Sequence, residues 1–194
     1  EESVRQVVVS QSALETSLAA YEAAKALADA AQITYDAAFA AYRKGVGTVT
    51  DANLAQNQLL LARNASSDAY SGALSAAAAL AQSLYPEEEC GIWIGAHADD
   101  AAGNAYADCS VAFNESMGRA ISIGTYELVK LHAPLNRLNK AQVVAEGLKL
   151  GVPYDLTWSC YEGGEKACGK CATCIDRLAA FRANGCEDPI DYED

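Results

Sequence analysis

Apolar side chains recur with a helical period over the first eighty residues. Larger residues follow steps of four and three, with Lys25 and Gln32 at intervening positions, and they lie at Leu14, Leu18, Tyr21, Ala28, Tyr35, Phe39 and Tyr42. The same steps continue later on smaller side chains, at Ala55, Leu59, Ala62, Ser66, Ala69, Ala73, Ala76 and Leu80. Heptad-like stripes of this kind predict two long helices that pack against each other.

A chain reversal separates the two predicted helices. Residues 43–48 read Arg-Lys-Gly-Val-Gly-Thr. Basic side chains suit a last helical turn, because the helix dipole favours them there, and the glycines let the backbone turn. Thr50 and Asp51 follow as capping residues for the second helix. We therefore expect a long antiparallel helical hairpin over residues 1–82. Two helices alone bury little apolar surface, so we also expect homo-oligomers.

Beyond residue 86 the pattern changes to alternating strands and helices. Residues 91–96 form a short apolar run between an acidic run and the polar residues 97–100, as expected for a buried strand that ends in a loop. Residues 126–132 are a second strand candidate. Ser110 and Asn139 are expected to cap helices that end near residues 122 and 150. The predicted fold class is α plus α/β, a hairpin over 1–82 followed by a partial α/β domain over 83–194.

Composition excludes several classes of function. All seven cysteines follow residue 85, which supports two dissimilar parts. The net charge of -12 repels a phosphate backbone, so we expect no nucleic-acid partner. Apolar runs stay below the roughly 18 residues that a spanning helix needs, and the opening Glu-Glu-Ser lacks the basic start of a signal peptide. We expect no membrane partner and a cytoplasmic location.

The clearest chemical signal is a group of four cysteines near the C-terminus. Their spacing is C-x7-C-x2-C-x2-C, at Cys160, Cys168, Cys171 and Cys174. Two residues between cysteines let a tight turn direct neighbouring thiolates at one ion, and glycines at 163, 164 and 169 supply backbone freedom. Four sulfur ligands suit tetrahedral zinc, so we expect a structural zinc knuckle. An iron–sulfur cluster and a pair of disulfides are the alternatives.

Polar side chains near the predicted strands are candidates for ligand contacts. His97 lies beside two carboxylates at a strand end, where open α/β sheets bind ligands, although a structural histidine is the simpler interpretation. Lys140 at a helix start could meet an anion or could be an ordinary solvated lysine. Acidic residues 187–194 are expected to form a solvated tail. The remaining thiols are expected to be buried, at Cys90, Cys109 and Cys186. Cys109 is the one that could instead meet a ligand, because it lies in a loop between a strand end and a helix start.

Two stretches around the chain reversal carry a first family resemblance. They are Ala41-Tyr-Arg-Lys-Gly-Val-Gly-Thr-Val-Thr-Asp-Ala52 and Leu59-Leu-Leu-Ala-Arg-Asn-Ala65. Through them, residues 1–82 resemble a coiled-coil hairpin of TolC-like outer-membrane efflux proteins, in which a Tyr-x-x-Gly-x-x-Thr turn lies at the periplasmic tip and meets an adaptor protein. This chain lacks that family's barrel strands and other hairpins, so we expect no export duct from it alone.

A second resemblance covers residues 74–192. It rests on the cysteine group and on the stretches Ile94-Gly-Ala-His-Ala-Asp-Asp100, Tyr106-Ala-Asp-Cys109, Leu138-Asn-Lys-Ala141 and Thr157-Trp-Ser-Cys-Tyr161. These are similar to the C-terminal half of the 7-cyano-7-deazaguanine synthase family of queuosine biosynthesis, a PP-loop type of ligase. The resemblance implies conversion of a deazapurine, 7-carboxy-7-deazaguanine, to its nitrile with ammonia and ATP, using magnesium.

The same resemblance implies roles for individual residues. Zinc would be held by Cys160, Cys168, Cys171 and Cys174. Substrate would be contacted by His97, Asp99, Asp108 and Lys140.

The sequence departs from the synthase pattern in two respects. Ala107 stands where the family usually has proline, and the Ser-Gly-Gly-x-Asp-Ser phosphate loop does not occur in these residues, so the family's ATP site is missing. Residues 74–81 fit both resemblances. We interpret the chain as a chimera that is inactive alone. A structural or interaction protein with a zinc-stapled module is the alternative, and a ligase whose hairpin replaces the lost half is a third reading.

Overall fold

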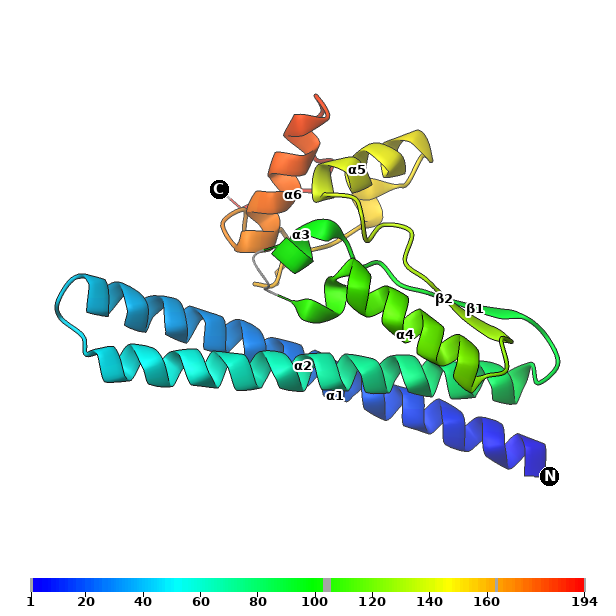
Figure 1. The fold of residues 1–194 in the computed structure, drawn as a ribbon. Coiled ribbons are helices and arrows are strands. Elements are labelled where there is room, and N and C mark those ends of the chain that lie inside the picture. The colour runs from blue at the N-terminus through cyan, green and yellow to red at the C-terminus, as the bar shows by residue number, and fades with distance from the viewer. Residues whose placement is uncertain (1, 103–105, 163, 194) are drawn as a thin grey trace. The chain divides into compact units, whose positions relative to one another are not determined.

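A computed structural model describes residues 2–102, 106–162 and 164–193 (Figure 1). In chain order the α-helices and strands are α1 (Glu2–Arg43), α2 (Val49–Leu84), β1 (Cys90–Trp93), α3 (Ala98–Ala101), α4 (Val111–Gly124), β2 (Val129–His132), α5 (Lys140–Lys149) and α6 (Ala172–Ala183). Short 3-10 helices lie at η2 (Ala107–Cys109) and η3 (Tyr154–Leu156). The two predicted long helices are therefore present as α1 and α2.

Two compact units make up the chain. One comprises Glu1–Ile94 with Ala101–Ala133, and the other comprises Gly95–Asp100 with Pro134–Asp194. The predicted division into 1–82 and 83–194 concerned sequence origin rather than compactness, and it stays a prediction. The long helices share the first unit with the strands and α4, whereas the cysteine group lies in the second unit.

After the turn that follows α1, helix α2 begins slightly earlier than predicted. Gly45 adopts φ +74°, a left-handed conformation that suits glycine at a helix end. Thr48, rather than Thr50, is the N-cap of α2. Its hydroxyl accepts a hydrogen bond of 3.1 Å from the Asp51 amide, and the Asp51 carboxylate accepts one from the Thr48 amide. This reciprocal capping box fixes the helix start.

Side chains of α1 contact side chains of α2 near the start of α1 and again closer to the turn between the helices. Ser10 and Ser83 hydroxyls lie 3.0 Å apart, and Arg63 donates a hydrogen bond of 2.6 Å to the Gln32 side chain. Between these contacts the Tyr21 and Tyr70 rings lie 5.1 Å apart. The two helices thus run side by side over most of their length (Figure 1).

Small side chains line the contact between α1 and α2. The stripe predicted on α2 is buried from Ala55 to Ser66, and Ala28 of α1 is also buried. Three members of the stripe predicted on α1 are instead well exposed, namely Leu18, Phe39 and Tyr42. The predicted positions Leu14, Tyr21 and Tyr35 are half-buried, and so are the small residues Ser17, Ala24, Ala31 and Ala38. Small residues on both helices permit close approach, which displaces the bulky side chains to the edges of the contact.

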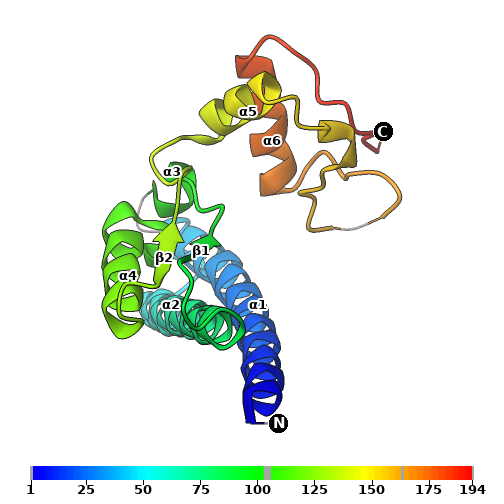
Figure 2. The same ribbon diagram turned by 90° about the vertical axis from the view of Figure 1, so that its right-hand side faces the viewer.

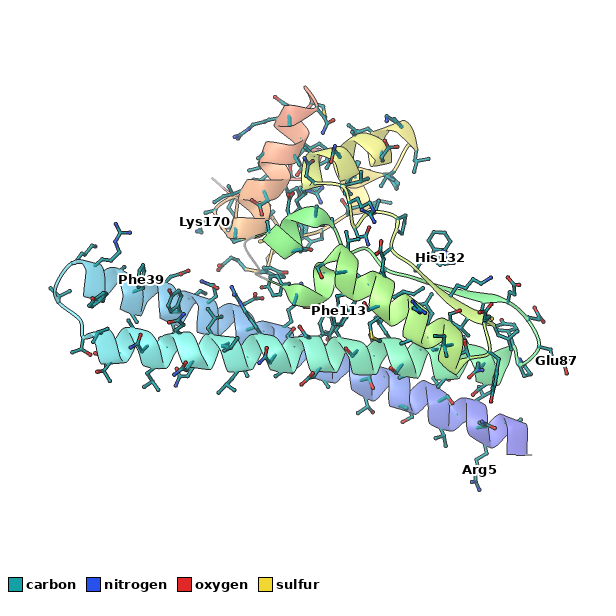
Figure 3. The ribbon with its side chains drawn as sticks, viewed as in Figure 1. Arg5, Phe39, Glu87, Phe113, His132 and Lys170 are labelled. Carbon is teal, nitrogen blue, oxygen red and sulfur yellow. The ribbon has the colours of Figure 1, made fainter. Side chains whose placement is uncertain are left out.

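Strands β1 and β2 form a two-stranded parallel sheet, with Cys90 opposite Val129 and Trp93 opposite His132. The crossover between them contains α4. The buried core of this unit contains Leu74, Ala78, Ile121 and Val129, so one face of the sheet packs on α2 and α4. Figure 2 shows the sheet beside α4 and α2, and Figure 3 shows Phe113 on the side of α4 nearest α2.

Both predicted strands are present but shorter than expected. The second begins only at Val129, because Tyr126 and Glu127 have φ of 53° and 66°, which is incompatible with strand backbone. The Trp93 and His132 rings stack with centroids 4.5 Å apart, and Figure 3 labels His132 of this pair. A Cβ atom added at Gly91 would lie 3.1 Å from both rings, a tight contact that glycine avoids.

Both predicted helix caps in the second half of the chain are confirmed. The Ser110 hydroxyl accepts a hydrogen bond from Phe113, and Asn139 forms a capping box with Gln142 at the start of α5. In the second unit, α5 and α6 pack around Val144, Ala180 and Phe181. Within the described ranges, none of the helices has the length and apolarity needed to span a bilayer.

Candidate metal centre and substrate loop

The four cysteines of the predicted knuckle come together. Their Sγ atoms all lie within 4.8 Å of one another. Cys160, Cys168 and Cys174 are buried, Cys171 is half-buried, and Ile190 and Tyr192 pack against them. Four converging sulfur atoms in an apolar shell are a donor set that could hold a metal ion such as zinc.

Each cysteine is positioned by local backbone geometry. Cys160 ends the extended segment that follows η3, and the Trp158 indole donates a hydrogen bond of 3.1 Å to its carbonyl. Cys168 and Cys171 flank Gly169, whose φ of +69° makes the tight turn that was predicted from the spacing. Cys171 is the N-cap of α6, and Cys174 lies in its first turn.

Backbone amides face the sulfur atoms. The Cys168 amide donates to Cys160 Sγ at 3.4 Å, and the Cys171 amide donates to Cys168 Sγ at 3.3 Å. A hydrogen bond with the Thr173 hydroxyl is the main influence that lowers the pKa of the Cys171 thiol, to about 5. Amide donors of this kind stabilise thiolates, the form of cysteine that binds metals.

The arrangement fits one shared ion better than paired disulfides. All seven cysteines are free thiols, and the Cys168 and Cys174 sulfurs are 4.0 Å apart, about twice the length of a disulfide bond. Sulfur ligands alone suit either zinc or an iron–sulfur cluster, so the geometry does not choose between these two. The other three cysteines, expected to be buried, are only half-buried.

Two of the candidate substrate residues are in direct contact. The Asp99 carboxylate accepts a hydrogen bond of 2.7 Å from the backbone amide of Lys140. Both residues line a hollow of about 360 Å³ at the start of α5, together with Asn139, Asp176 and Ala180. Sequence reasoning missed Asp176, although its place two residues after Cys174 puts it on the helix that the metal centre organises.

His97 lies on the same short segment as Asp99 but makes different contacts. Its Nε2 is 3.4 Å from the Asp100 carboxylate, and its buried Nδ1 has no hydrogen-bond partner among the described residues. The side chain is 15% exposed. His97 is therefore close to the carboxylate that follows Asp99, and it retains one ring nitrogen for a further partner.

Asp108 belongs to the other compact unit. It is 1% exposed within η2, where Ser67 of α2 donates a hydrogen bond of 3.2 Å to Oδ1 and the Asn114 amide donates one of 3.2 Å to its carbonyl. The Oδ2 atom has no partner in the part of the chain that the structure describes. Burial raises the pKa of the neighbouring Tyr70, with the Cys109 and Asp108 charges contributing. Asp108 is thus a loop anchor with one unused acceptor.

The prediction of a solvated acidic tail is wrong for three of its residues, whereas the other four described ones are exposed. Asp188 is buried and accepts hydrogen bonds from Arg177 and Tyr192. Ile190 and Tyr192 pack on the cysteine group. The tail's composition suggested solvation, but its apolar side chains and the buried Arg177 bring it onto the metal centre. Residue 194 lies outside the described residues.

Comparison with known proteins identifies a matching family and relatives of part of the chain. The model of the family described as "Queuosine biosynthesis protein QueC" matches residues 21–185. A 7-cyano-7-deazaguanine synthase of Caldicellulosiruptor saccharolyticus is 49% identical over 120 residues, which are 62% of this chain and 51% of the relative. Those of Marinobacter nauticus and Thermoplasma acidophilum are 48% and 46% identical over 102 and 124 residues. These alignments cover 53% and 62% of this chain and 45% and 50% of the relatives, so the chain spans about half of their length.

Proposed function

The chain belongs to the queuosine biosynthesis protein QueC family, and on that premise we propose that it is the zinc-binding C-terminal portion of a 7-cyano-7-deazaguanine synthase-like ligase. The observation that carries the proposal is the convergence of Cys160, Cys168, Cys171 and Cys174 within a region about half identical to such synthases. The complete reaction would convert 7-carboxy-7-deazaguanine to its nitrile with ammonia and ATP.

In this proposal the four cysteines hold a structural zinc ion. A four-thiolate site leaves no open coordination position, so zinc would supply folding energy rather than reaction chemistry. It would join the segment ending at Cys160 to the start of α6. The backbone amides that face the Cys160 and Cys168 sulfur atoms support this role, because such donors suit metal-bound thiolates.

The substrate would meet the chain through its polar strand-end loop. His97 offers an unpartnered ring nitrogen, and Lys140 offers its ammonium at the hollow beside Asp99. Asp99 contributes by holding the start of α5 rather than by a free carboxylate, because that carboxylate is already bound. Asp108 carries an unused buried acceptor, which a ligand N–H could satisfy.

ATP and magnesium belong to the reaction, but we propose that this chain alone binds neither in a productive way. The phosphate loop of the family does not occur in its sequence. The test is incubation of the purified chain with 7-carboxy-7-deazaguanine, ammonia, ATP and magnesium, with product followed by mass spectrometry. The proposal predicts no nitrile, and ATP-dependent nitrile formation would overturn it. A parallel calorimetric titration with ATP should show no micromolar binding.

A second proposal concerns α1 and α2. We propose that they form an antiparallel coiled-coil hairpin of the TolC-like type, joined to the synthase-like portion as a chimera, and that it acts as an interaction arm. Large apolar side chains that remain exposed support an associating role; they include Leu27, Ile33, Leu54 and Leu61. The family match already begins at residue 21, inside α1, so it places no junction near residues 74–86.

Self-association distinguishes the two proposals. An interaction arm predicts that sedimentation of the full chain shows a dimer or larger species. Polar substitution of Leu54 and Leu61 together should then return it to a monomer without changing zinc content. A monomeric wild-type chain would count against the interaction arm and would leave the first proposal, a zinc-binding synthase-like portion, standing.

A further inference from the structure

A polar cluster with a buried ion pair at its centre connects the segments that carry the four cysteines. It consists of Thr157, Arg177, Asp188 and Tyr192, and we call it the clamp. We propose that the clamp residues are positioning residues for the four-cysteine centre, which hold its separate segments at the spacing that retains a metal ion. This inference rests on the proposed metal function of the same cysteines.

Arg177 joins α6 to the segment that leads to Cys160. It lies three residues after Cys174, so both side chains lie on the same face of α6. Its Nη1 donates a hydrogen bond of 2.9 Å to the Thr157 hydroxyl, and its Nη2 donates one of 3.1 Å to the Tyr154 carbonyl. One guanidinium therefore fixes the approach of Cys160 to Cys174.

Asp188 fixes the guanidinium in turn. Its carboxylate accepts hydrogen bonds from Arg177 Nε at 2.5 Å and from Nη2 at 2.8 Å. The Arg177 and Asp188 side chains are 8% and 1% exposed. A two-point bond between a guanidinium and a carboxylate has one preferred geometry, so this pair specifies orientation as well as contact.

Tyr192 extends the clamp to the knuckle that carries Cys168 and Cys171. Its hydroxyl donates a hydrogen bond of 2.6 Å to Asp188. Its ring covers Gly169, where an added side chain would lie 3.4 Å from it. The backbone on either side of Tyr192 pairs with Ala167, through hydrogen bonds of 3.0 Å and 2.8 Å.

The clamp therefore reaches all three ligand-bearing segments, namely the one ending at Cys160, the knuckle, and the start of α6. None of its side chains offers a sulfur or occupies the space between the four Sγ atoms. The clamp would therefore affect metal binding by positioning the cysteine ligands. Residues that surround the ligands of a metal site commonly act in this way.

The test compares full-length chains that carry Asp188→Asn, Tyr192→Phe or the control Asp191→Asn. Asp191 lies in the same segment, and its exposed side chain undergoes the same change of charge. Each protein is loaded with zinc, and zinc transfer to excess chromogenic chelator is timed. Each is also loaded with cobalt, whose visible spectrum per bound ion reports the ligand geometry. We expect D188N to release zinc on the order of tenfold faster and to alter the cobalt spectrum, whereas D191N should match the wild type.

The possible outcomes test the proposed metal function and the role of the clamp separately. A wild-type chain that binds neither zinc nor cobalt would refute the proposed metal function itself. If the wild type binds metal but D188N shows the same release rate and the same spectrum per bound cobalt, the clamp inference is overturned. If circular dichroism shows that D188N does not fold, Tyr192→Phe decides by the same criteria, since it removes one hydroxyl and keeps the ring. A variant that is only less stable would keep the wild-type spectrum for each bound ion.

Discussion

The Asp99 carboxylate accepts a hydrogen bond of 2.7 Å from the backbone amide of Lys140, 41 residues later in the chain. This bond ties the loop after β1 to the first turn of α5, where a negative charge also suits the helix dipole. Two residues proposed for substrate contact therefore also hold each other in place. Their effects on ligand binding and on local stability need to be measured separately.

Asp99→Ala should weaken the start of α5 by about 1 kcal/mol, because the Lys140 amide loses its acceptor and the helix loses a favourable charge. Asp99→Asn keeps an acceptor oxygen and should lose less. Amide hydrogen exchange along α5 measures the effect. Asp155→Ala, an exposed change in the same unit, serves as the control. Equal exchange in the wild type and both Asp99 variants would contradict the capping role.

The Arg177–Asp188 pair should make the chain sensitive to acid. Burial alone would raise the pKa of Asp188, but hydrogen bonds from Arg177 and Tyr192 outweigh it and hold that pKa below its ordinary value of 3.8. Because the folded pKa is the lower one, the stabilisation is complete above pH 3.8 and is lost as the pH falls through the folded pKa.

Urea unfolding of metal-free wild type and D188N, on both sides of pH 3.8, tests this dependence. The free-energy difference should be about 3 kcal/mol at the higher pH values, since removing one charge of a buried pair leaves the other unpaired. It should shrink in acid, where Asp188 itself becomes neutral. A difference that does not change with pH would show that the charge of Asp188 is not what stabilises the fold.

Two glycines in helices should respond oppositely to alanine. At Gly147 a methyl group would overlap the Tyr154 hydroxyl and lie 2.8 Å from Cζ of the same ring. Gly147→Ala should destabilise the chain by about 1–3 kcal/mol, despite the better helix propensity of alanine. At Gly72 nothing lies within 4 Å, so Gly72→Ala should stabilise α2 by roughly 1 kcal/mol. Thermal unfolding of both variants checks the signs, and destabilisation by Gly72→Ala would be inconsistent with this packing.

The contact between α1 and α2 should tolerate substitutions at exposed positions. It should not tolerate larger side chains at the buried positions between the two helices, which form the seam. Ala62 is 4% exposed in the seam, so Ala62→Leu should cost about 1–3 kcal/mol through overpacking. Gln58, about one turn earlier, is exposed, and Gln58→Ala should change stability by less than about 0.5 kcal/mol. Thermal unfolding of the two variants, monitored by circular dichroism, compares their stabilities. A neutral Ala62→Leu variant would show that the helices are not closely packed there.

Structural features that depend on residues close together in the chain could be predicted from the sequence. The caps at Ser110 and Asn139 depend on partners only three residues away, and the knuckle depends on the short spacing between Cys168 and Cys174. The existence of two strands followed from apolar runs. Their ends did not, because the left-handed backbone at Tyr126 and Glu127 leaves no pattern in the side chains.

Long-range partnerships could not be predicted in this way. The burial of Asp108 depends on Ser67, 41 residues away, and that of Asp188 depends on the guanidinium of Arg177 on α6. From the sequence, Asp188 was expected to lie in a solvated tail, and Asp108 was expected to contact substrate. On α1, Ala28 of the predicted stripe is buried, but Leu18 and Phe39 are exposed, because the close approach of small side chains as well as hydrophobicity selects the contact line.

X-ray absorption at the zinc edge of the purified full-length chain shows directly whether the four cysteines hold zinc. We expect one zinc ion per chain surrounded by four sulfur atoms at about 2.3 Å, a signal lost in Cys174→Ser and retained in Cys186→Ser. A chain that takes up no zinc, or zinc with nitrogen and oxygen neighbours in place of four sulfurs, would contradict it.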